Sequence, residues 1–108
     1  MEREFSSSYL DALDRRVLLY DGAMGTQLMA MELTDADYGG ETLRGCNEAL
    51  VLARPDIVET IHATYLAAGA DVVETDSFMG SRLKLAEYGL GDRTLEVNRR
   101  AAEIARAA

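Results

Sequence analysis

The sequence contains no tryptophan, and it has a single cysteine, a single proline and a single histidine. One cysteine excludes an internal disulfide, and it cannot supply the full set of Cys or His ligands that a structural zinc site needs. We therefore expect Cys46 to be a small, semi-buried packing residue rather than a reactive or metal-binding one.

Basic residues are also scarce: 11 lysines and arginines stand against 19 acidic residues, for a net charge of −8. No basic cluster is present that could follow a phosphate backbone. No apolar run is long enough to span a bilayer, and residues 1–9 hold charges and serines where a secretory signal would have an apolar stretch. These absences make nucleic acid and membrane unexpected partners and favour a cytoplasmic location.

Hydrophobic residues make up 48% of the chain, which is enough for the core of one domain. Two short apolar runs, residues 17–20 and 71–75, have the character of strands that are covered on both faces. No hairpin signal joins them, so we expect them to be parallel and connected by a right-handed crossover.

Helical spacing of apolar residues recurs elsewhere in the chain. Ser8 and Asp11 resemble a capping pair for a first helix, whose Leu10 and Leu13 would face inward. Residues 27–52 are irregular and predict a short helix followed by a long polar excursion. The helices expected with defined limits cover residues 9–15, 55–68, 81–88 and 93–107, the last with Val97, Ala101, Ile104 and Ala105 on its inner face.

This order of elements predicts an α/β fold. Two strands cannot make a covered sheet by themselves, so the chain looks incomplete. It would be either a fragment of a larger barrel or a chain that finds its missing strands in another copy, and its open sheet edges make self-association an expected property.

The first candidate site is the glycine-rich turn at residues 21–26, directly after the first apolar run. Glycines allow backbone N–H groups to approach a carboxylate or a phosphate closely, and Asp21 adds a carboxylate that could meet an ammonium group. The alternative is a tight turn into a helix that Asp21 caps.

The second candidate is the polar stretch of residues 74–78, Glu-Thr-Asp-Ser-Phe, at the end of the second run. Ends of neighbouring parallel strands open onto one face, so both candidates would meet at one site. Capping of the next helix by Asp76 or Ser77 is the alternative. Asn47 and Glu48 could fold back over this site or could equally cap the short segment that leads to Pro55. His62 is expected to be a partly exposed packing residue.

Taken together, these motifs resemble the homocysteine S-methyltransferase family, most closely its cobalamin-dependent members. The matching segments are residues 18–26, 45–48, 54–71 and 74–78. The chain departs from the family pattern at Cys46, where relatives commonly carry asparagine, and at Asp76 and Ser77, where the pattern has asparagine and threonine.

The resemblance implies the first part of a TIM (β/α)8 barrel that binds homocysteine. It also implies a zinc ion, held by three cysteine thiolates that this chain lacks, and methylcobalamin on a separate domain. Residues 1–16 would be an N-terminal arm with a short helix, and residues 17–108 a truncated N-terminal portion of the barrel. The substrate-binding residues implied are Asp21, Gly22, Ala23, Met24, Glu74, Thr75 and Ser77.

The function expected is to hold the amino-acid end of homocysteine while its sulfur receives a methyl group to give methionine. The chain alone would be inactive, because the half of the barrel with the zinc ligands is missing. No residue in the chain is expected to be catalytic or to bind a metal. Two alternatives remain: a stand-alone amino-acid-binding or assembly module, and a different barrel enzyme whose glycine turn holds a phosphate. The lack of a basic residue in the turn counts against the last.

Overall fold

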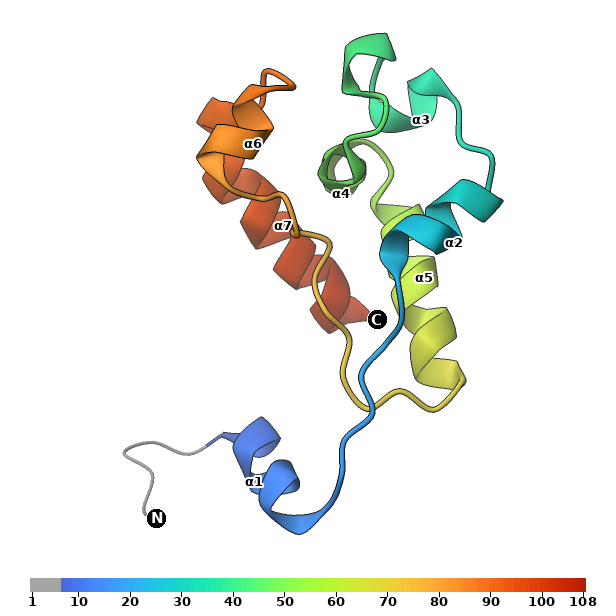
Figure 1. The fold of residues 1–108 in the computed structure, drawn as a ribbon, viewed down its shortest axis with the longest axis vertical. Coiled ribbons are helices and arrows are strands. Elements are labelled where there is room, and N and C mark those ends of the chain that lie inside the picture. Colours follow the sequence, from blue (N-terminus) through green and yellow to red (C-terminus); the bar gives the residue numbers. More distant parts are fainter. Residues whose placement is uncertain (1–6) are drawn as a thin grey trace.

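The structure is a computed structural model that describes residues 7–108, and the regular elements in this range are helices (Figure 1). The first six residues of the predicted N-terminal arm lie outside the described residues. The α-helices are α1 (Ser8–Arg15), α2 (Met24–Ala30), α3 (Asp35–Tyr38), α4 (Leu50–Ala53), α5 (Pro55–Ala67), α6 (Arg82–Ala86) and α7 (Thr94–Ala107). Single 3-10 turns lie at η1 (Glu41–Leu43), η2 (Asn47–Ala49) and η3 (Gly91–Arg93).

Helices α4, α5 and α7 pack against one another and form the centre of the molecule. Helix α5 begins with Pro55, buries Ile57 and Ile61, and is followed by Gly69 at a φ of 114°. Helix α7 buries Val97, Ala101 and Ile104 on one face. The apolar spacing therefore predicted both long helices correctly, because each has one face that the core covers.

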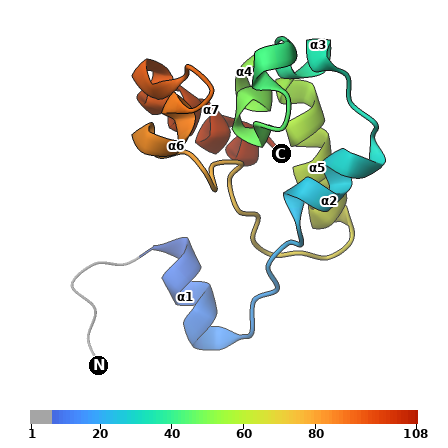
Figure 2. The same ribbon diagram turned by 45° about the horizontal axis from the view of Figure 1, so that its top comes forward.

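Helix α1 differs from its prediction. Its N-cap is Ser7, whose hydroxyl oxygen accepts a hydrogen bond from the backbone N–H of Leu10 at 3.2 Å, so the predicted Ser8–Asp11 pair is wrong. No residue of α1 is buried, and Leu13 is 44% exposed instead of facing inward. The helix lies apart from the other helices (Figures 1 and 2).

The region predicted as a long polar excursion supplies part of the core. Residues 46 and 48–51 are buried and continue directly into α5. Helix α6 is shorter than the predicted helix at residues 81–88 and is capped by the Ser81 hydroxyl. The buried apolar residues are Leu28, Cys46, Ala49, Leu50, Val51, Ile57, Val58, Ile61, Leu85, Leu90, Val97, Ala101 and Ile104.

The predicted α/β fold is wrong. Between residues 7 and 108 neither apolar run forms a strand, and a lone parallel bridge pairs Tyr20 with Val72. The predicted TIM-barrel fragment is therefore also wrong, because a barrel of this kind is built from strands.

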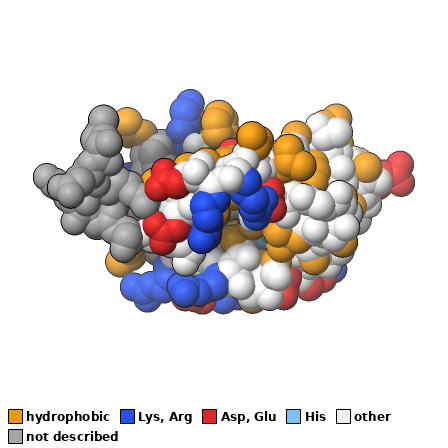
Figure 3. Space-filling view, turned by 90° about the horizontal axis from the view of Figure 1, so that it is seen from below, with side chains coloured by type: hydrophobic (Ala, Val, Ile, Leu, Met, Phe, Trp, Pro, Cys, Tyr) orange, Lys and Arg blue, Asp and Glu red, His pale blue; other side chains and the backbone are white. Residues whose placement is uncertain are grey.

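The physical reason is that, within the described part of the chain, no further strand lies beside the two runs. Val17 is 84% exposed and Leu19 is 60% exposed. Leu18, Val72 and Val73 are only partly buried, so the runs lack the cover on both faces that buried strands have. Hydrophobic side chains also reach the surface at several places on the face seen in Figure 3. Self-association through these segments stays a prediction.

The two runs nevertheless lie side by side as extended segments (Figures 1 and 2). The backbone N–H of Asp71 donates to the Leu19 carbonyl at 2.7 Å, and that of Asp21 donates to the Val72 carbonyl at 2.9 Å. The residues that follow each run are therefore brought together. Among the helices described, none combines the length and the apolar character that crossing a bilayer requires.

Candidate functional site

A pocket of about 410 Å³ lies where the two extended segments end. It contains six of the seven residues predicted to bind substrate, all except Ser77, and their role in binding stays a prediction. Residues 47 and 48, from the η2 turn, complete it from a third part of the chain. The lining residues are Asp21, Gly22, Ala23, Met24, Gly25, Asn47, Glu48, Glu74, Thr75, Asp76, Phe78 and Met79.

Asp21 ties the two extended segments together at the edge of the pocket. Its Oδ2 accepts a hydrogen bond from the backbone N–H of Glu74 at 3.2 Å, in addition to the backbone bond to Val72. One carboxylate oxygen is thus already engaged by the protein, and the predicted contact to a ligand ammonium group would fall mainly to the other oxygen.

The glycine turn is held against α5 by Tyr65, whose hydroxyl donates to the Ala23 carbonyl at 2.9 Å. Gly22 allows this close approach, because a Cβ at this position would lie 2.8 Å from the Tyr65 hydroxyl oxygen. Within residues 7–108, the N–H groups of Gly22 and Ala23 donate no hydrogen bond to another described residue. They are free to meet an anionic group in the pocket.

We predict that Gly22→Ala displaces the Tyr65 hydroxyl and lowers the free energy of unfolding by about 1 kcal/mol, since a hydrogen bond typically contributes about that much. Denaturant unfolding followed by circular dichroism measures the change. Gly25→Ala is the matched control, because a Cβ there meets only Asn47 Nδ2 at 3.7 Å and the position is helical. Equal losses in the two variants would contradict the prediction.

Glu48 is 2% exposed and joins the η2 turn to the second segment. Its Oε2 accepts a hydrogen bond from the backbone N–H of Met79 at 3.2 Å, and the Cys46 thiol donates to its Oε1 at 3.9 Å. The sequence suggested that this residue could fold over the site or cap the segment before Pro55, and no local signal showed that its carboxylate would be buried in the pocket wall.

Asp76 is 5% exposed and lines the same pocket as Glu48. Its Oδ2 is buried without a hydrogen-bond partner, so neither helix capping nor any other contact satisfies it. Burial, together with the negative charge of Glu48, raises the pKa of Asp76 from 3.8 to about 7.

Thr75 and Ser77 are linked to each other by their hydroxyls, whose oxygens lie 2.6 Å apart, and the Ser77 backbone N–H donates to the Thr75 carbonyl at 2.8 Å. Ser77 does not line the pocket. Its hydroxyl instead contacts that of Thr75, which does, so Ser77 is placed to orient its neighbour.

Cys46 and His62 are more buried than predicted, at 1% and 0% exposed. Burial raises the pKa of the Cys46 thiol and lowers the pKa of His62, and neither ring nitrogen of His62 has a hydrogen-bond partner. Among residues 7–108, no three His, Cys, Asp or Glu side chains are grouped so that they could hold a metal ion. The described residues therefore do not fit the zinc site that the resemblance implies.

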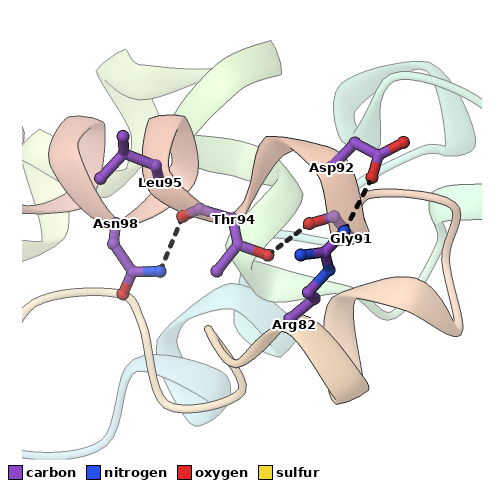
Figure 4. Close-up of a pocket in the computed structure, with 6 residues that line it drawn as sticks. All are labelled: Arg82, Gly91, Asp92, Thr94, Leu95 and Asn98. Atoms are coloured by element: carbon purple, nitrogen blue, oxygen red, sulfur yellow. Dashed lines mark hydrogen bonds and ion pairs between the residues drawn. The ribbon is translucent and has the colours of Figure 1, made fainter.

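A second pocket, of about 550 Å³, lies between α6 and the start of α7 (Figure 4). Its polar groups bond to one another: Thr94 Oγ1 donates to the Gly91 carbonyl at 2.6 Å, and Asn98 Nδ2 donates to the Thr94 carbonyl at 2.8 Å. Arg82 reaches Asp92 at 3.4 Å. These contacts fix the start of α7 and leave no unpartnered buried group that would mark a ligand site.

Comparison with known proteins identifies the family. The chain matches the homocysteine S-methyltransferase family over residues 18–108, a range that includes every residue of the first pocket. It belongs to that family of methyltransferases, which confirms the resemblance carried by the motifs.

Two relatives are methionine synthases. The chain is 46% identical over 102 residues to methionine synthase of Mycobacterium tuberculosis, and 44% identical over 105 residues to methionine synthase of Mycobacterium leprae. These alignments cover 94% and 97% of this chain. The chain spans only 8% of the length of each relative.

Proposed function

We propose that the chain is part of a homocysteine S-methyltransferase of the methionine synthase type, acting in the cytoplasm, and that its pocket binds the amino-acid end of homocysteine. The observation that carries this proposal is the meeting of two separate motifs, residues 21–25 and 74–76, in one pocket of a chain that belongs to the family. The pocket combines free backbone N–H groups with acidic side chains.

This combination matches the two charges of an amino acid. The carboxylate of homocysteine would accept hydrogen bonds from the N–H groups of residues 22–24, and its ammonium group would lie toward Asp21, Glu74 and Thr75. Ser77 would act through Thr75. With the amino-acid end held in this way, the side chain of the ligand is directed outward, so that its sulfur can meet a methyl donor supplied elsewhere.

The methyl transfer itself needs groups that this chain does not supply. The family resemblance implies zinc to favour the thiolate of homocysteine and methylcobalamin to donate the methyl group. Since the described residues group no set of metal ligands, the chain alone is expected to bind and not to catalyse.

Amide NMR of the chain during titration with L-homocysteine tests the proposal. We expect the signals of residues 21–25 and 74–76 to shift in a saturable way. Thr75→Val should weaken binding about tenfold by removing the hydroxyl at the pocket, since a lost hydrogen bond to a charged group costs about 1.5 kcal/mol or more. Thr64→Val is the matched control, because the Thr64 hydroxyl bonds to the Thr60 carbonyl within α5. Absence of saturable shifts in the folded chain would reject the proposal.

A further inference from the structure

Glu48 and Asp76 are two carboxyl groups that lie in the wall of the same pocket, each at least nine-tenths buried. Glu48 is anchored by the Met79 N–H and the Cys46 thiol, whereas Asp76 Oδ2 has no partner. A buried carboxylate oxygen without a donor is costly, so this arrangement calls for either a proton or a cation.

Among residues 7–108, no positively charged group shifts the pKa of Asp76. The negative charge of Glu48, from η2, raises the pKa of Asp76. The charge of Asp76 in turn raises the pKa of Tyr38, in α3, and of Cys46. The negative charge of this pair must therefore be neutralised by a cation that binds in the pocket or by a proton on one of the two carboxyl groups.

A metal ion fits poorly, because no third ligand is grouped with the pair among the described residues. A primary ammonium group fits better, since it needs hydrogen-bond acceptors on a few sides and brings a single positive charge. Asp21 adds a further acceptor from the edge of the pocket, because only one of its carboxylate oxygens accepts the Glu74 N–H.

We propose that Glu48 and Asp76 complete, together with Asp21, the ammonium-binding subsite of this pocket, and that Asp76 carries a proton while the pocket is empty and releases it to solvent when a primary ammonium group binds. This inference rests on the proposed function, because it names the part of the pocket that recognises the amino group of the amino acid.

Binding then becomes linked to pH. Because the ligand selects the ionised form of Asp76, the apparent affinity falls in proportion to the fraction of protein in that form, about tenfold for each pH unit below the midpoint of its titration. Asp76 has a pKa of about 7 in the empty pocket, so the affinity should rise from about pH 5.5 to about pH 7 and then level off.

Carbon NMR of the Asp76 side-chain carboxyl, followed through a pH titration, tests the proposal. Saturating L-homocysteine should lower the midpoint of this titration by about two units or more, which is the shift that a more than tenfold dependence of the affinity on pH requires. Mercaptobutanoate, which lacks only the amino group, should not lower it. An unchanged midpoint while the amide signals of residues 22–24 show homocysteine bound would overturn the subsite and leave the proposed function standing. Absence of any pocket shifts would overturn both.

Asp76→Asn supplies a second test, because asparagine has a similar shape and does not titrate. The variant should bind homocysteine with an affinity that changes less than about twofold between about pH 5.5 and about pH 7.5, where the unmodified chain changes more than about tenfold. Asp92→Asn, at a side chain that is 97% exposed, should keep the full pH dependence. If Asp76→Asn also kept it, Asp76 would not be the group that releases the proton.

Discussion

Asp76→Asn is expected to stabilise the fold by up to about 4 kcal/mol above about pH 7 and to change its stability little near pH 4. The pKa of Asp76 is raised from 3.8 to about 7 in the folded chain, a difference of about three units, and each unit corresponds to about 1.36 kcal/mol. Asparagine has no charge to bury, and its amide can donate a hydrogen bond where the carboxylate cannot.

The sign follows from which state holds the proton more tightly. Asp76 binds its proton more tightly in the folded chain than in the unfolded one, so its contribution to stability is fully present below about pH 4 and is lost as the pH rises through about 7. Urea unfolding at about pH 4 and about pH 8 measures the difference between the variant and the unmodified chain. Asp92→Asn is the control and should stay within about 0.5 kcal/mol at both values. An equal effect of Asp76→Asn at the two pH values would show that its burial does not perturb its ionisation.

His62→Leu is the second substitution with a large expected effect, a gain of about 1–3 kcal/mol in the free energy of unfolding near pH 7. His62 is fully buried on α5 and neither of its ring nitrogens has a hydrogen-bond partner. Leucine has a similar volume, so it removes the unsatisfied polar atoms with little loss of packing. Urea unfolding near pH 7 measures this gain.

The pH dependence at His62 has the opposite sign to that at Asp76. Burial lowers the pKa of His62 below 6.5, although the charge of Asp21 opposes the shift. Its contribution to stability is therefore present above about pH 6.5 and is lost as the pH falls. His62→Gln separates the two effects, because glutamine stays polar but does not titrate. It should remove this acid loss without the gain near pH 7, and a gain equal to that of leucine would show that the unpartnered nitrogens are not costly.

The long helices could be predicted from the sequence because their apolar spacing is satisfied by neighbours within the chain. Helix α7 buries Val97, Ala101 and Ile104 as the pattern indicated, whereas α5 buries Ile57 and Ile61 as expected and also Val58 and His62. The apolar runs at residues 17–20 and 71–75 have the composition of buried strands, but a strand also needs neighbours on both edges and faces, and here a lone bridge joins the two. The composition of a segment indicates whether its side chains suit a buried strand. Whether it forms one depends on how many neighbouring strands and helices are present to cover it.

The sequence predicted that the ends of the two apolar runs meet at one site. This part of the prediction needs only a single bridge between the two segments, not a full sheet. Asp21 and Glu74 meet because Tyr20 pairs with Val72. The roles of Glu48 and Asp76 were not predictable, because their burial depends on the folding of η2 against the second segment and not on any local pattern. The apolar run from Ala49 to Leu52, just before Pro55, was the available signal that this part of the chain enters the core.

The most direct test of homocysteine binding in the pocket is the measurement of intermolecular nuclear Overhauser effects between L-homocysteine and the methyl groups of the chain. The pocket presents methyl groups from Ala23, Met24, Thr75 and Met79, whereas Met29 lies outside it and is 82% exposed. We expect contacts from the ligand to the four pocket methyl groups and none to Met29. Contacts to Met29 or to other surface methyl groups, with none in the pocket, would contradict the proposed function.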